Sequence, residues 1–212
     1  MTIDRRIAGI NDVPINKATL LLGGNGSYAH QMMAGSELLQ PLLETGGGIL
    51  FENTPNISTA YGAQYSPVEL THTNYDYQSY GKTSVTNVTV VSKFTARTLY
   101  EADYMLAVIH FLRTFSKMGF GENDPYRGNP PAIMKFSAYG AYMINNTPVA
   151  IRNFTVQLPE HVDYVQTSFA TQVPIYLELS IDLLPMPTPN KVKRDFSLEG
   201  FASGQLVNRG YL

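Results

Sequence analysis

Histidine is the side chain best suited to acid–base or metal chemistry near neutral pH, and this chain has four. They are His30, His72, His110 and His161, and no two stand in a His-x-His or His-x-x-x-His pattern. His110 lies inside a long apolar stretch, which favours a core or interface histidine over a ligand. The sequence also lacks the Gly-x-Ser-x-Gly pattern of a nucleophile elbow. We therefore expect no metal site and no catalytic residue.

A glycine run near the N-terminus, Gly23-Gly24-Asn25-Gly26-Ser27, has the composition of a phosphate-binding loop. A Walker loop needs a lysine before its final Ser or Thr, because that lysine reaches the phosphates, and none stands here. A dinucleotide fingerprint would need a third glycine at position 29, which is Ala29. The run is therefore interpreted as a flexible turn, and no cofactor is expected.

Neighbouring acidic residues are sparse: Glu101 with Asp103, Glu122 with Asp124, and Glu160 with Asp163. Residues two apart on a helix point in different directions, so the first pair cannot act together there. The Glu122–Asp124 stretch lacks the Asp-x-Asn-x-Asp-Gly pattern of a calcium loop. The sequence offers no pair of carboxylates for general acid–base catalysis.

The stretch from Tyr61 to Tyr80 is crowded with tyrosine and uncharged polar residues. Tyrosines could stack nucleic-acid bases, but such sites also need cations for the phosphates, and Lys82 is the one cation nearby. Tyrosine also supplies a large contact area with little conformational entropy to lose. A protein contact surface is therefore the favoured interpretation of Tyr75–Tyr80.

The composition indicates an ordered protein with little surface charge. The 212 residues are 44% hydrophobic and only 15% charged, below the usual quarter, so disorder is not expected. The net charge of −2 gives no basic field to bind nucleic acid stably. Uncharged polar surface loses little on desolvation, which suits a subunit buried by neighbours. An ordinary β-rich domain fits the composition equally well.

The cysteine content and the hydropathy indicate the cellular compartment in which the protein is made. There is no cysteine, which excludes disulfides and thiolate metal sites and is compatible with a reducing compartment. Residues 1–6 lack the apolar run of a signal peptide, and no stretch is long enough to span a membrane. We expect a soluble protein made in a cytoplasm.

The clearest predicted element is one long helix over about 97–118. Thr98-Leu-Tyr-Glu101 is a capping box that marks its start, and Gly119 marks its end. The apolar residues between them surround most of the helix, which predicts burial on several sides.

Alternating apolar residues predict strands on both sides of this helix. The clearest runs are 88–95 and 175–183, and a long hairpin is expected over about 133–157 with its turn at Asn145-Asn146. The predicted class is α+β, mainly β: a helix covering a curved antiparallel sheet over residues 65–190. Residues 1–64 are expected to form an irregular arm with short elements, including a helix at 36–44 interrupted by Pro41. Residues 191–212 are expected to form a tail that docks elsewhere.

Several segments of this region have a familiar order and spacing. They are Phe94–Tyr104, Phe111–Gly121, Gly128–Pro131, Tyr139-Gly140 with Asn145–Val149, Leu158-Pro159 with Val162–Val165, and Val173-Pro174 before the strand ending at Leu184-Pro185. Together, over about 66–192, they resemble the baseplate tube-cap and tail-tube initiator proteins of contractile-tailed bacteriophages.

The resemblance implies a tail-tube-like β-sandwich or barrel, with the helix on its flank. It implies a hexameric ring in which long hairpins join into one barrel around a channel. On this basis the 133–157 hairpin would form the barrel, and the helix would pack between subunits. The side chains expected at these contacts are Tyr104, His110, Tyr139, Tyr142, Asn145, Asn146, Arg152 and Phe154.

The implied function is structural. The chain would form a ring at the baseplate–tube junction, initiate or cap the tail tube, and contact the tube subunit and the baseplate hub and wedge proteins. It would be assembled in the host cytoplasm, reside in the virion, bind no membrane, and let DNA pass through the lumen. The alternatives are a tail-tube or tail-terminator subunit and, from another class, a hub-associated glycan-binding or hydrolase module.

Overall fold

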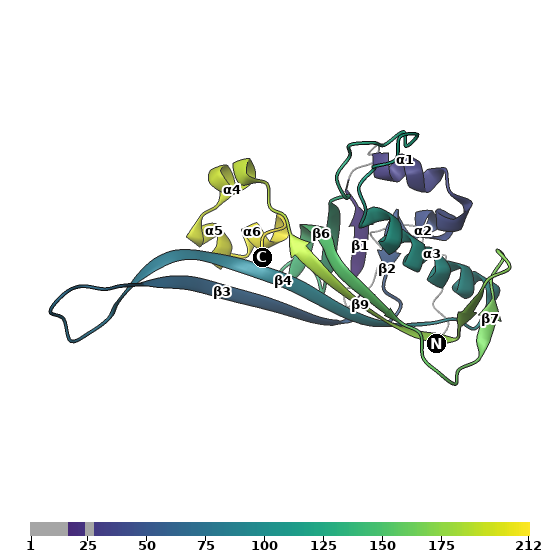
Figure 1. Ribbon diagram of the computed structural model, residues 1–212, viewed down its shortest axis with the longest axis horizontal. Helices are drawn as coiled ribbons and strands as arrows, with labels where there is room; N and C mark the ends of the chain where they lie inside the picture. Colours follow the sequence, from purple (N-terminus) through teal and green to yellow (C-terminus); the bar gives the residue numbers. More distant parts are fainter. Residues whose placement is uncertain (1–16, 24–27) are drawn as a thin grey trace.

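The computed structural model describes residues 17–23 and 28–212 (Figure 1). Within them, one antiparallel sheet of seven strands has the order β2-β1-β5-β6-β9-β4-β3. Its strands are β1 (Thr19–Leu22), β2 (Gly48–Leu50), β3 (Asn56–Val68), β4 (Tyr77–Thr95), β5 (Met134–Ala138), β6 (Ile144–Gln157) and β9 (Tyr176–Pro185). A separate pair consists of β7 (Tyr164–Gln166) and β8 (Gln172–Pro174). The prediction of a mainly β protein with a large antiparallel sheet is confirmed.

The described helices lie on one side of this sheet (Figure 1). They are α1 (Tyr28–Ala34), η2 (Glu37–Leu39), α2 (Gln40–Glu44), α3 (Leu99–Phe115), α4 (Pro189–Asp195), α5 (Leu198–Ala202) and α6 (Gln205–Asn208). The core lies between the sheet and the helices, and Leu177, Leu179, Ile181 and Leu183 of β9 are buried in it.

Helix α3 begins at the predicted capping box. The Thr98 side chain accepts a hydrogen bond from the Glu101 amide, and the Glu101 carboxylate accepts bonds from the amides of Arg97 and Thr98. The helix ends at Phe115, slightly before the predicted end. Gly119 is required for a different reason, because a Cβ there would lie 2.1 Å from the carbonyl oxygen of Tyr126. This glycine permits a close backbone approach in the following loop.

The cover of α3 comes from the chain itself. It contacts η2 and α2 as well as β4, β6, β7 and β8. The Tyr104 hydroxyl, on a residue that is 2% exposed, donates to the Leu50 carbonyl and accepts from the Leu50 amide at 2.8 and 2.9 Å. Segments far away in sequence therefore bury this helix within one chain, so its burial does not by itself require a neighbouring subunit.

The described part of the predicted irregular arm belongs to the core, which corrects the prediction. Strand β1 lies inside the sheet between β2 and β5, and Leu20, Ile49 and Phe51 are fully buried. These strands are too short to show an alternating pattern. Gly48 allows them to approach, because a Cβ there would lie 2.2 Å from the Leu20 carbonyl oxygen. The boundary predicted at residues 64 and 65 falls inside β3.

The predicted 133–157 hairpin exists as β5 and β6, but its turn is misplaced in the prediction. The chain reverses over residues 139–143, where Tyr139 and Gly140 have positive φ. Asn146 also has a positive φ, of 49°, yet it lies within β6. Asparagine tolerates that conformation in a turn or a distorted strand, so the Asn-Asn signal is ambiguous. The hairpin that projects from the body is β3–β4 instead (Figure 1).

The C-terminal residues are expected to dock elsewhere, and in the structure they dock on the start of β6 in their own chain. The Asn145 side-chain amide donates to the side chain and carbonyl of Asn208, at 2.6 and 3.3 Å. Leu206 and Tyr211 are buried, and Leu212 packs against the core. Residues 189–212, here called the C-terminal unit, therefore sit at the start of β6.

The Tyr104 hydroxyl gives a test of how residues 17–50 are held on α3. Replacing Tyr104→Phe leaves both polar groups of Leu50 without this partner, so the free energy of unfolding should fall by about 1–3 kcal/mol. Tyr100→Phe is the matched control: it removes an exposed bond to Glu44 and should change stability by less than about 0.5 kcal/mol. Urea unfolding measures both, and equal effects would contradict this account.

Candidate interaction surface

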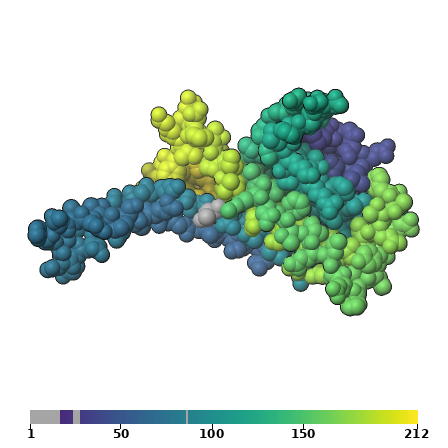
Figure 2. All heavy atoms as spheres, viewed as in Figure 1, coloured from purple at the N-terminus to yellow at the C-terminus, as the bar shows by residue number. Residues whose placement is uncertain are grey.

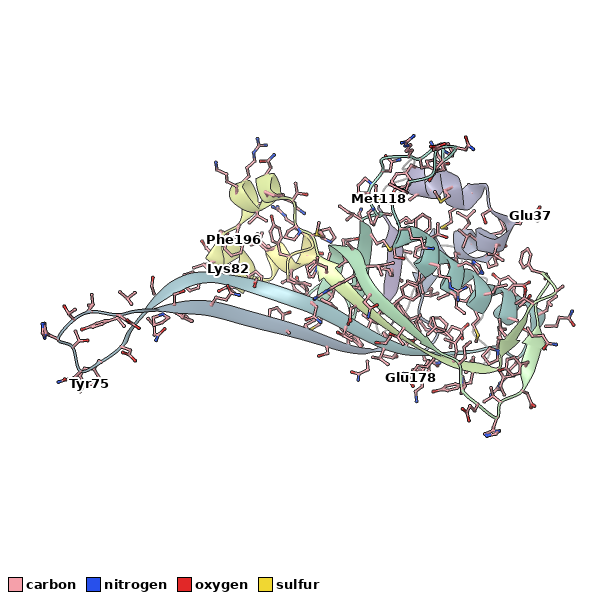
Figure 3. All side chains as sticks on the ribbon, in the orientation of Figure 1. Glu37, Tyr75, Lys82, Met118, Glu178 and Phe196 are labelled. Carbon is pink, nitrogen blue, oxygen red and sulfur yellow. The ribbon has the colours of Figure 1, made fainter. Side chains whose placement is uncertain are left out.

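The part of the β3–β4 hairpin beyond the sheet body is the most prominent feature of the molecule. Strand β9 pairs with β4 only from Val88 to Thr95, so residues 60–87 continue as a two-stranded extension. We call this extension the ribbon. It projects well past the rest of the protein (Figure 2) and carries Tyr75 at its tip (Figure 3). Both of its faces are exposed along most of its length.

The two faces of the ribbon differ in chemistry. One continues the core side of the sheet from Ile57 and presents Tyr61 and Tyr65 opposite Val85 and Tyr80. These tyrosines are 57–60% exposed, and the rings of Tyr65 and Tyr80 are 5.7 Å apart. The other face holds small or polar pairs: Gly62 with Ser84, Gln64 with Lys82, and Ser66 with Ser79. Near the tip this second face also carries Val68 opposite Tyr77, so the contrast between one aromatic and one polar face holds for residues 61–66 and their partners.

Two irregularities in β4 shape the ribbon. The register with β3 shifts between Ala60 and Tyr61 and again between Gln64 and Tyr65, leaving Thr86 and Gly81 as extra residues. Such bulges increase the twist and bend the strand. At Gly81 a Cβ would lie 3.3 Å from the Gln64 carbonyl oxygen, so a larger residue would need a small shift of the two strands. The curvature of the ribbon is therefore encoded in β4.

Within the described structure, the four adjacent strands β6, β9, β4 and β3 have an unpaired edge on each side. No described strand pairs with the outer side of β3. On the opposite side, β5 pairs with β6 no further than Val149, so residues 150–157 of β6 have only β9 as a neighbour. Pro67 lies in β3, as expected for an edge strand, because proline cannot donate to a ladder. Unpaired edges readily add another strand.

The sheet surface that faces away from the helices is polar. Thr89 donates to the Asp182 carboxylate at 2.7 Å and accepts from Asn87 at 3.2 Å. Further along the same surface, Lys93 of β4 lies opposite Glu178 of β9. The charged side chains at these positions are Lys93, Glu178 and Asp182, and Lys135 of β5 and Arg152 of β6 are exposed as well, so the sheet has no acidic excess.

Four of the predicted contact residues are buried or half-buried within the single chain. Tyr104 is buried, and Tyr139 is half-buried and donates to the Pro55 carbonyl at 2.7 Å. Phe154 packs against the core. His110 is half-buried, and its pKa is lowered by desolvation and then by the positive charge of Arg113. These side chains mainly hold the fold together.

The other four predicted contact residues lie along or just before β6. Tyr142 lies against the Gly204 turn, Asn145 bonds to Asn208, and the Asn146 backbone amide donates to Ser137 Oγ. Arg152 is the extra residue at a register shift in β6 and is exposed. Tyr142, Asn145 and Asn146 thus form a cluster that anchors the C-terminal unit.

Sequence reasoning missed the ribbon but found part of its surface. The predicted contact stretch Tyr75–Tyr80 forms its tip and the start of β4. The missed signal is the alternation of Tyr61, Ala63 and Tyr65 with small or polar residues. Because both faces of the ribbon meet solvent, this alternation lacks the hydrophobic contrast that marks a half-buried strand.

The described residues contain few groups arranged for chemistry. Glu101 belongs to the helix cap, and the Asp103 carboxylate accepts two hydrogen bonds from Ser168, so both acids have structural partners. No group of three or more His, Asp or Glu that could hold a metal occurs in residues 17–23 and 28–212. In the same ranges, every helix is too short or too polar to cross a bilayer. The glycine run at 23–27 lies mostly outside the described residues.

A scan against protein-family models finds no match, and a search of curated proteins finds no significant match either.

The ribbon should be the least protected part of the sheet in the free protein. A two-stranded extension with no core is marginally stable in water. Hydrogen–deuterium exchange of the monomer should therefore show residues 78–85 of β4 exchanging orders of magnitude faster than residues 88–95 of the same strand. Residues 177–183 of β9 serve as the protected control. Uniform protection along β4 would contradict this expectation.

Proposed function

We propose that this chain is a non-catalytic structural subunit of a contractile phage tail. It forms a ring, expected to be hexameric, at the junction of baseplate and tail tube, and it initiates or caps the tube. The observation that carries the proposal is the pair of free edges on the β6-β9-β4-β3 sheet. The sequence resemblance supplies the identity of the assembly.

Two different free edges favour head-to-tail assembly. The outer edge of β3 in one copy can pair with residues 150–157 of β6 in the next, and repetition around a rotation axis closes a ring. Closure would satisfy the backbone groups of every exposed edge, which is the usual benefit of a barrel. The ribbon, with little support in the monomer, would gain a neighbour along β3. The tail-tube-like barrel is thus built by β3–β4 in this proposal, with β6 as the accepting edge.

The proposed ring also orients the two sheet surfaces. Because the helices cover one side, curvature toward the opposite side would place the polar rows of Thr89, Lys93, Glu178 and Asp182 on the lumen. A lumen of mostly uncharged groups without a cluster of basic residues would let DNA pass without binding it, since stable binding needs basic residues. The partners in this proposal are other copies of the chain, the tube subunit, and the hub and wedge proteins.

A tail-tube subunit is the second candidate, because the same two edges would serve in each ring of a polymer. Electron microscopy and mass photometry of the purified protein, alone and mixed with the tube subunit of the same virus, separate the two. Single rings that seed tubes support the initiator. Long tubes formed by this chain alone support the tube subunit, and a monomer that ignores the tube protein counts against both.

The β3 edge provides the mutational test. Amides of alternate residues point the same way along a strand, and proline sits where its missing N–H faces away from the ladder. The Ala63 amide therefore points in the same direction as position 67, toward the free edge. Ala63→Pro should abolish rings, because a loss of about 1 kcal/mol per contact recurs around the ring. Ala63→Thr, which keeps the amide, should still form rings by mass photometry.

Thermal unfolding provides the folding control for this pair, because Ala63 is exposed and lies outside the core. Both variants should melt close to the unmodified protein. Rings that persist undiminished in Ala63→Pro would rule out β3 pairing as the ring contact.

A further inference from the structure

The ribbon joins the body through a short stretch in which the pairing of β3 with β4 is irregular. The register shifts between Ala60 and Tyr61, where Thr86 of β4 is the extra residue. A bulge of this kind interrupts the ladder of hydrogen bonds and leaves one residue unpaired. Just beyond it, Gly62 lies opposite Ser84. We call residues 60–62 and 84–87 the neck of the ribbon.

Gly62 is not required by the backbone conformation or by packing. It is not among the glycines with positive φ, so other residues could adopt its conformation. A Cβ added there would have no atom within 4 Å, so no contact excludes a side chain. Glycine in the interior of a strand weakens it, because it brings no side chain to pack and loses more entropy when it is ordered. The neck therefore combines a bulge with a residue that makes β3 easier to bend.

The strands on the body side of the neck are fixed. Val88 of β4 pairs with Leu183 of β9, and both side chains are fully buried. The Thr89 hydroxyl donates to the Asp182 carboxylate at 2.7 Å and adds a side-chain link between the same two strands. Strand β4 is thus held in the sheet from residue 88 onward.

The strands on the outer side of the neck are held to each other. The rings of Tyr65 and Tyr80 pack edge to face across β3 and β4, with their centres 5.7 Å apart. The hydroxyl groups of Tyr80 and Thr83 share a hydrogen bond of 2.8 Å, which spans the second bulge at Gly81. These contacts stiffen residues 63–83, here called the outer ribbon, so bending is concentrated in the neck.

We infer that the neck is a hinge. The outer ribbon moves about it as one piece, while β4 from Val88 onward stays in the sheet. The physical cause is the loss of β9 as a neighbour at the same place where the ladder is interrupted, since a two-stranded extension has no core to fix its direction. The ribbon of the free chain therefore takes a range of directions.

The hinge does not rest on the proposed ring, but such a ring would use it. The edge of β6 is free only over residues 150–157, because β5 pairs with β6 up to Val149. Strand β3 is longer than this edge and continues into the tip of the ribbon. Any part of a neighbour's ribbon that passes residue 150 must therefore leave the plane of that sheet to clear β5. A hinged ribbon can do so while β3 keeps its pairing near the body.

Distances between two nitroxide spin labels test the hinge, because the chain has no cysteine of its own. Gln78→Cys with Thr155→Cys places exposed labels on the outer ribbon and on β6, so this pair spans the neck. Lys135→Cys with Thr155→Cys keeps both exposed labels within the body. Pulsed electron paramagnetic resonance of the frozen protein, at a concentration where mass photometry shows monomers, should give a broad distance distribution for the first pair and a narrow one for the second.

Gly62→Thr, added to the first label pair, should narrow its distribution, because a β-branched side chain favours the extended conformation. Ser66→Thr is the matched control: it adds a β-branched residue on the same face of β3 but beyond the neck, and it should leave the distribution broad. Both positions are exposed, so thermal unfolding should show the same melting temperature in each variant. Equal widths for the two label pairs, or equal narrowing by Ser66→Thr, would overturn the hinge.

Discussion

Strand β9 holds the two halves of the main sheet together, because it is the only described strand that pairs with both β4 and β6. Its apolar side chains, Leu177, Leu179, Ile181 and Leu183, are all buried in the core. Burial of each contributes about 1.5–3 kcal/mol, which is large against the net stability of a domain. The same strand also limits the sheet: where its pairing with β4 stops at Val88, the core stops and the ribbon begins.

Because the pairing with β9 stops at Val88, the stable part of β4 and the part available for interaction are different residues. Residues 88–95 lie over a core, whereas residues 78–85 have a partner on one side only. Ordering a residue costs about 1–2 kcal/mol of backbone entropy, and the ribbon offsets this with few buried contacts. An extension of this kind is stabilised best by contacts with another molecule. The bulges at Gly81 and Thr86 are compatible with this, because a twisted, bent edge resists random edge-to-edge aggregation while still accepting a curved partner.

The hairpin that projects from the body is not the one that the sequence pattern favours. The sequence pattern favours residues 133–157, because Asn145-Asn146 is typical of a turn. In the structure these asparagines anchor the C-terminal unit, and the β3–β4 hairpin carries the free edge. The proposed ring therefore depends on residues before position 87, a region that the sequence pattern assigns largely to an irregular arm.

What the sequence determined by itself is local or strongly periodic. The capping box at Thr98 and Glu101 specifies a helix start through contacts within one turn, and the alternation in β9 specifies a strand with one buried face. Tertiary structure alone decided the rest, because it depends on pairing between distant segments. Leu20 and Ile49 become part of the core only when β1 inserts between β2 and β5. The hydroxyl of Tyr104 can be buried because it forms hydrogen bonds with both the amide and the carbonyl of Leu50. The ribbon has only a weak local signature, the alternation of Tyr61, Ala63 and Tyr65, since neither of its faces is buried by its own chain.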